Sequence, residues 1–269
     1  MKKALCFTYN EQYKKQGDLA LKSAKYHNNG YTTFHLTDNK KSSIADFAFE
    51  PKDIGLSHEE WIIIGRLYLT ELVLTELNYD SCIFLDGDTY TYNSYDDMQF
   101  ELDNGHSIVV IPHLTKPLPE DGLYPQNRSI CLAGNYNAGI WGINKKALNF
   151  LSWWKQQTLL FPKSIPEAGL ASEQGWLRFA CDFNDNTKIF KHPGYNVAYW
   201  NIKQRSLDIR NNEWIIDDQK LCVFHFSGLK QNIPPEHMSI FQNRYILNYS
   251  DPVYTIYKNY HDLVWQSNA

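Results

Sequence analysis

The sequence has few cysteines, and they are scattered. None of them forms a C-x-x-C pair, and the count is odd: Cys6, Cys82, Cys131, Cys181 and Cys222. Zinc knuckles need closely spaced ligand pairs, and the disulfide frameworks of small secreted domains are much denser in cysteine. The cysteine pattern therefore argues against both and favours a reducing compartment.

Long apolar runs are also missing. A membrane-spanning helix needs about 20 consecutive apolar residues, and the sequence contains no such run. The apolar N-terminal stretch 4–7 is interrupted by Thr8 and Asn10, so it is too short for the core of a signal peptide. These absences predict a soluble protein of the cytoplasm, either free or peripheral to a membrane.

A basic excess is absent as well. Lys and Arg total 26 against 30 for Asp and Glu, which gives a formal net charge of -4. Nucleic-acid-binding domains usually carry a strong positive surplus, so this balance argues against a nucleic-acid partner. Hydrophobic residues make up 43% of the chain and charged residues 21%, which is enough for a sizeable core and argues against global disorder.

Alternating strand and helix patterns predict an α/β fold. Strands are expected at Lys3–Tyr9, Tyr31–Leu36, Cys82–Leu85, Ser107–Ile111, Ala138–Ile143, Ile189–Phe190 and Val223–Phe226. Helices are expected at Asp18–Tyr26, Glu59–Leu77, Lys146–Gln157, Ser172–Phe183 and Asp251–Trp265. A strand-helix-strand start is typical of a mostly parallel sheet with helices on its faces.

The strongest chemical signal is Asp86-Gly87-Asp88, directly after an apolar strand. Ligands of open α/β sheets bind beyond the carboxyl ends of the strands, which is where this motif falls. Two carboxylates separated by a small residue can both face Mg²⁺ or Mn²⁺, and such a cation neutralises a bound diphosphate. Gly87 lets the backbone approach a ligand closely. The alternative is a plain turn, because Asp and Gly are common turn residues.

In its surroundings this motif resembles a known enzyme family. The run Tyr79–Thr89, YDSCIFLDGDT, is similar to the acidic segment of GT-A glycosyltransferases, especially the retaining enzymes of family 8. Further segments match in order: Phe7-Thr8-Tyr9-Asn10, Asn137-Ala138-Gly139 and His225-Phe226-Ser227-Gly228-Leu229-Lys230. Residues 107–265 also resemble a group of poorly characterised bacterial glycosyltransferases, above all through GYNVAYWN at Gly194–Asn201.

The resemblance implies a GT-A-like fold with a twisted, mostly parallel central sheet flanked by helices. It implies transfer of a sugar from a nucleotide-sugar donor, a UDP-sugar, with retention, onto a glycan, lipid-linked or protein acceptor. Mn²⁺ or Mg²⁺ would be held by Asp86, Asp88 and His225, although a hydrogen-bonded core histidine is the ordinary alternative for His225. We expect one catalytic domain over 1–269, with a nucleotide-binding half (1–105), a donor-sugar and acceptor half (106–250) and a C-terminal helix (251–269).

The resemblance also assigns residues to the donor. Thr8, Tyr9 and Asn10 would hold the nucleobase and ribose, and Arg66 would lie near the donor sugar or phosphate. Donor contacts are further implied at Asp86, Gly87, Asp88, Asn137, Gly139, Gly228 and Lys230. Lys230 comes one residue earlier than in the family, and free surface charges are the alternative for Lys230 and Arg66.

Glu173 and Gln174 are the expected catalytic pair, at a position where the bacterial group usually has Asp-Gln. Glu173 would hydrogen-bond donor hydroxyls and Gln174 would lie near the anomeric carbon; in an inverting enzyme Glu173 would be the general base. The alternative is a helix cap with Ser172. The acceptor side is expected at Asn196, Tyr199, Trp200 and Asn201, with core packing as the alternative for the two aromatic residues.

Two other functions fit the same kind of sheet. A sugar-nucleotide nucleotidyltransferase would need a glycine-rich basic loop after the first strand, but Phe7–Glu11 has no glycine and ends in an acid. A non-catalytic sugar-binding protein would not need the complete set Asp86, Asp88 and His225. The tail Asp251–Trp265 either docks on the domain or rests on a membrane, and its low basic content favours docking.

Overall fold

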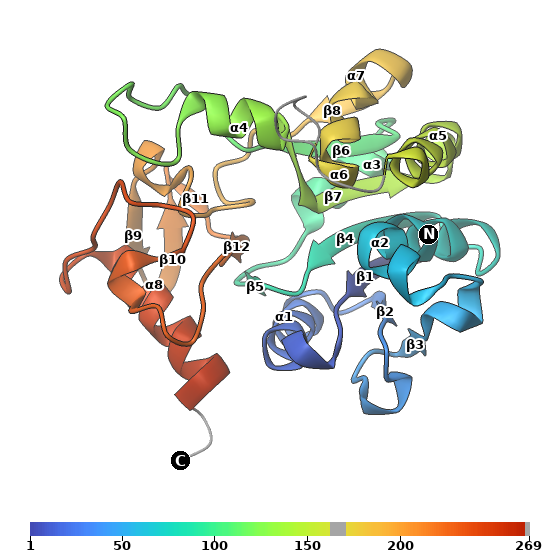
Figure 1. The fold of residues 1–269 in the computed structure, drawn as a ribbon, viewed down its shortest axis with the longest axis horizontal. Helices are drawn as coiled ribbons and strands as arrows, with labels where there is room; N and C mark the ends of the chain where they lie inside the picture. Colours follow the sequence, from blue (N-terminus) through green and yellow to red (C-terminus); the bar gives the residue numbers. More distant parts are fainter. Residues whose placement is uncertain (162–170, 267–269) are drawn as a thin grey trace.

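The computed structural model describes residues 1–161 and 171–266. Its centre is a seven-stranded sheet in the order β3-β2-β1-β4-β7-β6-β8 (Figure 1). The strands are β1 (Lys3–Thr8), β2 (Tyr31–Leu36), β3 (Phe47–Phe49), β4 (Ser81–Asp86), β6 (Ile108–Pro112), β7 (Tyr136–Asn144) and β8 (Thr187–Ile189). β7 runs antiparallel to β4 and β6, and the other neighbouring pairs are parallel. The predicted α/β fold with a mostly parallel sheet is confirmed.

Helices cover both faces of this sheet, because successive side chains of a strand point to opposite faces. On one face Cys6, Phe84 and Trp141 belong to a core that includes α2 (His58–Thr75) and α5 (Leu148–Leu160). On the other face Phe7 and Leu85 pack in a core with α1 (Lys14–His27) and α3 (Asp96–Asp103). Strands buried on both faces explain the unbroken apolar runs in the sequence.

A third core lies beside the sheet, on the left of Figure 1. It includes the strand β12 (Val223–His225), which pairs antiparallel with β5 (Thr89–Thr91), and the helix α8 (Pro252–His261). The rings of Phe226 and Tyr260 stack at 3.7 Å, so α8 docks on the body of the protein. The remaining elements are α4 (Asn127–Ala133), β9 (Leu207–Arg210), β10 (Glu213–Ile216) and β11 (Gln219–Lys220).

The helix expected from Ser172 to Phe183 is wrong as one element. It is divided into α6 (Ser172–Trp176), a 3₁₀ turn at Leu177–Phe179 and α7 (Ala180–Phe183). Side chains donate hydrogen bonds to backbone carbonyls of this segment, which a continuous helix would use itself. Arg178 Nε donates to Gly175 O at 2.9 Å, and Thr187 Oγ1 donates to Ala180 O at 2.6 Å. The tail helix covers the expected range, but only α8 is α-helical, and a π-helical turn at Asp262–Gln266 follows it directly.

A helix that crosses a membrane must be both long and apolar, which the described helices are not. Within 1–161 and 171–266, none combines the length and the apolar character that crossing a membrane requires. This finding agrees with the lack of long apolar runs in the sequence.

Candidate metal and donor site

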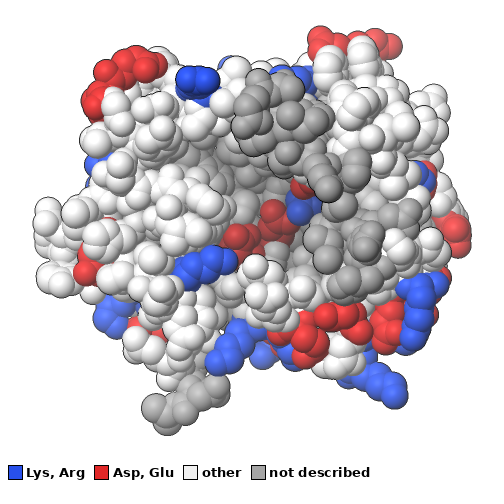
Figure 2. All heavy atoms as spheres, in the orientation of Figure 1, with Lys and Arg blue, Asp and Glu red and all other residues white. Residues whose placement is uncertain are grey.

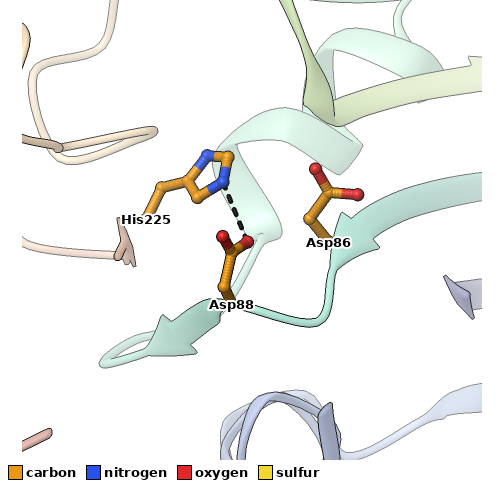
Figure 3. A group of neighbouring side chains, drawn as sticks. All are labelled: Asp86, Asp88 and His225. Atoms are coloured by element: carbon orange, nitrogen blue, oxygen red, sulfur yellow. Dashed lines mark ion pairs between the residues drawn. The ribbon is translucent and has the colours of Figure 1, made fainter. Parts of the chain in front are cut away.

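Asp86, Asp88 and His225 converge beyond the end of β4 (Figure 3). Ligand atoms of all three residues lie within 4.8 Å of one another. Asp86 ends β4 and Asp88 precedes β5, and the pairing of β5 with β12 places His225 opposite Thr89. The backbone N–H of Phe226 donates to the carbonyl of Asp88 at 2.8 Å and fixes this register. A short strand pair therefore brings a distant histidine to the two acids.

The charges of the three side chains are coupled. His225 Nε2 lies 2.9 Å from Asp88 Oδ1, as the dashed line in Figure 3 shows. Burial raises the pKa of Asp88, but attraction to His225 and the hydrogen bond between them outweigh it, so that pKa lies below its ordinary value. Burial raises the pKa of Asp86 above its ordinary value even though Arg66 counteracts the shift. Against the effect of burial, Asp88 in turn raises the pKa of His225, so the three side chains and Arg66 form one coupled group of charges.

The space between these side chains is kept open by Gly139 on β7. A Cβ atom at this position would lie 2.5 Å from Asp86 Oδ2 and 2.7 Å from His225 Cε1. Two carboxylate oxygens and one imidazole nitrogen are a donor set that suits Mn²⁺, and the carboxylates also suit Mg²⁺. The residues present therefore fit a divalent cation.

Asn196 contacts the His225 ring on the side away from Asp88. Its Oδ1 lies 3.2 Å from His225 Nδ1, and the Asn196 side chain is fully buried. The backbone of Asn196 has a φ of 50°, in the left-handed region that Asn adopts more readily than most residues. The structure therefore makes Asn196 a partner of His225, where the sequence placed it on the acceptor side.

Arg66 on α2 faces the site and is not a surface cation. Its Nη1 donates to Ala138 O at 2.9 Å and lies 3.2 Å from Asp86 Oδ1 and 3.4 Å from Glu173 Oε1. The guanidinium group thereby links the acid that ends β4 to the acid on α6. Glu173 makes this ion pair and caps nothing, because α6 has Ala171 as its N-cap with no side-chain cap bond.

A cavity of about 260 Å³, the donor cavity, opens beside the acids. Its lining comes from the ends of β1 and β4 with the residues that follow them, from α1 and α2, and from the loop after β12: Thr8, Tyr9, Tyr13, Gln16, Arg66, Asp86, Gly87, Asp88, Gly228, Leu229 and Lys230. A smaller hollow of about 160 Å³ shares several of these residues and adds Asn10 and Trp61. Figure 2 shows acidic and basic side chains side by side in a hollow near the middle of this face.

The amides of Asn137 and Gln174 are engaged within the protein. Asn137 accepts from Gly139 N–H at 2.9 Å, and its Nδ2 lies 3.1 Å from His113 Nε2. Gln174 accepts from Ala138 N–H at 3.0 Å and donates to Ala133 O at 2.8 Å. Because both ends of the Gln174 amide are used, its side chain links the start of β7 to the end of α4.

The residues expected on the acceptor side separate into two groups. Asn201 is 1% exposed; its side chain accepts from Ala198 N–H and donates to the carbonyls of His113 and Asn196. Trp200 packs edge-on against His225. Tyr199, in contrast, lines a second cavity. The structure thus buries all four residues, and Tyr199, at 8% exposed, is the one of them that lines the second cavity.

Four residues that line the donor cavity or the hollow beside it were not predicted as site residues, and one of them, Leu229, lies between the predicted Gly228 and Lys230. Tyr13 and Gln16 lie just after the carboxyl end of β1, and the rule that ligands bind at this edge would have included them. Trp61 lies on α2 before Arg66, where its apolar character suggests only core packing. Lys230 Nζ lies 5.3 Å from the centre of the Tyr13 ring, which ties the two walls of the cavity together.

Comparison with known proteins gives a result at the level of the fold. No protein-family model and no curated protein sequence matches the chain. The crystal structure of the glycosyltransferase GlyE in Streptococcus pneumoniae TIGR4 is similar to it, with a TM-score of 0.52 and 16% identity, over 99% of this chain and 62% of that chain. The apo-form crystal structure of GlyE gives a TM-score of 0.55 and 18% identity over the same shares. The chain has a glycosyltransferase fold.

These identities support the fold and nothing finer. The chain spans 62% of the length of the GlyE structures that it matches. The reaction, the donor and the acceptor must therefore be argued from the site of this chain.

Proposed function

We propose that the protein is a metal-dependent glycosyltransferase that transfers a sugar from a UDP-sugar to a glycan, lipid-linked or protein acceptor. The observation that carries the proposal is the convergence of Asp86, Asp88 and His225 within 4.8 Å. They stand at the carboxyl edge of a sheet with a glycosyltransferase fold, next to a cavity lined by charged residues. This is where an anionic nucleotide would be bound and neutralised.

The donor cavity offers positive charge on two sides. Mn²⁺ or Mg²⁺ bound by the two acids and the histidine supplies Lewis-acid stabilisation of a diphosphate leaving group. Arg66 and Lys230 line the same cavity from different elements and add cationic hydrogen-bond donors for phosphate oxygens. Tyr9, Tyr13 and Trp61 give the adjoining hollow aromatic walls for a base and ribose.

Transfer with retention is the course we propose. Glu173 lies at the edge of the donor site, oriented by Arg66 at 3.4 Å, where a carboxylate can stabilise an oxocarbenium-like donor sugar. If inversion occurs instead, Glu173 is still the acid placed to act as the general base. The anomeric configuration of the product, read by NMR, distinguishes the two courses.

The test is a screen of nucleotide sugars with Mn²⁺ that measures the release of free nucleoside diphosphate. We expect a UDP-sugar to be turned over, and Asp88→Asn to lower the rate by about 100-fold or more, as loss of one strong transition-state contact does. Asp208→Asn is the matched control, because Asp208 is an exposed acid of β9. Unchanged turnover in Asp88→Asn would refute the metal assignment.

The same screen separates the other two functions. A non-catalytic sugar-binding protein would bind nucleotide sugars in the presence of a chelator and release no diphosphate. A nucleotidyltransferase would consume a nucleoside triphosphate and a sugar phosphate and release pyrophosphate. Either result would replace the proposed reaction.

A further inference from the structure

A second cavity, which we call the neutral cavity, lies between α4 and the segment 239–247. Its volume is about 540 Å³, and its lining is Tyr124, Pro125, Ser129, Ile130, Ala133, Tyr199, Ile240, Phe241, Gln242 and Asn243. None of these described lining residues carries a charge. The donor cavity, in contrast, is lined by Arg66, Asp86, Asp88 and Lys230. The neutral cavity therefore suits an uncharged ligand and not a nucleoside diphosphate.

The walls of the neutral cavity are fixed before any ligand binds. The side chain of Arg244 is 2% exposed; it pairs with Asp121 and donates to Leu123 O at 2.8 Å and Pro125 O at 3.0 Å. Tyr124 N–H donates to Asn243 Oδ1 at 2.7 Å, and Asn243 N–H donates back to Tyr124 O at 3.1 Å. A buried arginine and a reciprocal pair of bonds thus lock the two loops together, as preorganised binding sites require.

The neutral cavity shares a wall with the donor cavity. Ile240 N–H donates to Gly228 O at 3.0 Å, and a Cβ atom on Gly228 would lie 2.6 Å from Phe241 Cδ2. Gly228 itself lines the donor cavity. Near the catalytic side, Ala133 of the neutral cavity accepts a hydrogen bond from Gln174, the neighbour of Glu173. A ligand in the neutral cavity would therefore lie next to the donor.

The chemistry of the lining favours a sugar over an apolar chain. Tyr124 and Phe241 are large aromatic residues that remain 51% and 56% exposed. Aromatic faces stack on the C–H faces of sugar rings, and the Tyr199 hydroxyl and the Asn243 Nδ2 suit sugar hydroxyls. A lipid tail would gain nothing from the Tyr199 hydroxyl or the Asn243 Nδ2.

We infer that the neutral cavity binds an uncharged saccharide, namely the sugar-bearing part of the acceptor. The inference rests on the proposed transferase function, since it assigns the occupant of a cavity that adjoins the proposed donor site. It makes Tyr124, Tyr199 and Phe241 the residues that select the acceptor.

The test begins with the fluorescently labelled full chain on an array of neutral mono- and oligosaccharides. Dissociation constants for the best ligand are then measured by calorimetry. We expect Tyr124→Ala and Phe241→Ala each to raise the dissociation constant about tenfold, as truncation of an aromatic anchor does. Tyr26→Ala is the matched control, because Tyr26 is an 83% exposed tyrosine on α1; it should bind as the unchanged protein does.

Three results would overturn the inference. The first is that the unchanged protein binds no saccharide. The second is that Tyr124→Ala and Phe241→Ala bind the saccharide as tightly as the unchanged protein does. The third is that the protein binds dodecyl maltoside but not maltose, which would indicate an apolar occupant. UDP binding with Mn²⁺, measured in parallel, keeps the two proposals distinguishable. Saccharide binding without UDP binding supports the neutral cavity and refutes the donor site, whereas UDP binding without any saccharide binding does the reverse.

Discussion

His225 Nδ1 lies 3.2 Å from Asn196 Oδ1, and the two side chains are 4% and 0% exposed. This contact orients the imidazole so that Nε2 faces Asp88. Outer partners of this kind fix the ring of a metal-binding histidine, and their loss typically costs about 10–100-fold in metal affinity. Asn196 is therefore a positioning residue for the proposed metal site.

Replacement of Asn196 tests this relationship. Asn196→Gly keeps the backbone at its φ of 50° but removes the oxygen, and we expect Mn²⁺ affinity to fall about 10-fold or more. Asn196→Asp restores an oxygen at the same place and should recover most of the affinity. Electron paramagnetic resonance of free Mn²⁺ measures both. Equal affinity in the glycine variant and the unchanged protein would show that Asn196 only fills space.

A methyl group on Gly139 should close the metal site. Its Cβ would lie 2.5 Å from Asp86 Oδ2, so Gly139→Ala is expected to abolish Mn²⁺ binding and lower turnover by about 100-fold. Gly142→Ala on the same strand is the control, because its Cβ would meet the flexible ends of Leu102 and Met98 at 3.1 and 3.3 Å. We expect this control to cost about 1–2 kcal/mol in unfolding free energy and to bind Mn²⁺ normally. Equal metal binding by both variants would contradict the argument.

Arg66→Lys should separate charge from geometry. Lysine keeps the positive charge but lacks the guanidinium group that lies 5.0 Å from the centre of the Phe84 ring while its Nη1 contacts Ala138 O, Asp86 and Glu173. We expect a loss of about 1–2 kcal/mol in unfolding free energy, because an acid is left partly unpaired, and a fall in kcat larger than the rise in KM. Urea unfolding and steady-state kinetics measure the two effects. A pure increase in KM would mean that Arg66 contributes only to ground-state binding.

His35 should make the fold sensitive to acid. The His35 ring stacks on Tyr9 at 3.6 Å. Burial lowers the pKa of His35 to about 4, and Lys14 contributes in the same direction. Asp18 and Asp38 raise this pKa, but by less than burial lowers it. The unfolded chain, with a pKa near 6.5, therefore takes up the proton first as the pH falls, and stability decreases between about pH 6.5 and pH 4. The contribution is about 2 kcal/mol between pH 7 and pH 4.5.

The measurement for His35 is urea unfolding at pH 7 and pH 4.5. His35→Gln keeps a hydrogen-bonding group but does not titrate, so its loss of stability on acidification should be smaller by about that amount. The exposed His237 provides the comparison: His237→Gln should lose stability with pH as the unchanged protein does. If the free energy of unfolding falls equally with pH in His35→Gln and in the unchanged protein, the buried imidazole is not the cause of the acid sensitivity.

The central sheet could be predicted because its strands are apolar on both faces. β1 and β4 are unbroken runs of buried residues, and the acids stand directly after one of them. The pairing that completes the site was beyond prediction: β5 and β12 are three residues each, and their register depends on contacts between distant segments. The convergence on His225 was therefore expected from resemblance and not from the apolar pattern.

The roles of single polar residues were harder to predict. Asn196 and Gln174 have the side chains of ligand-binding residues, but Gln174 uses both ends of its amide inside the protein and the Asn196 oxygen faces His225. The partners of such an amide come from segments that are distant in the sequence, so the local sequence does not predict whether it faces a cleft or the protein itself. Arg66 shows the converse, because an arginine within a helix has the pattern of a surface residue and yet points to Asp86.

The β5–β12 pair also joins two separately packed parts of the molecule. Asp86 follows the residues of the sheet cores, whereas His225 follows Phe224 of the third core. A cation shared by these side chains would fasten one packing unit to the other, and its binding free energy would resist their separation. The site is complete only when the C-terminal part of the chain, which carries His225, has been synthesised and has folded. A truncated or proteolysed protein that lacks this part would keep Asp86 and Asp88 but would not bind the metal.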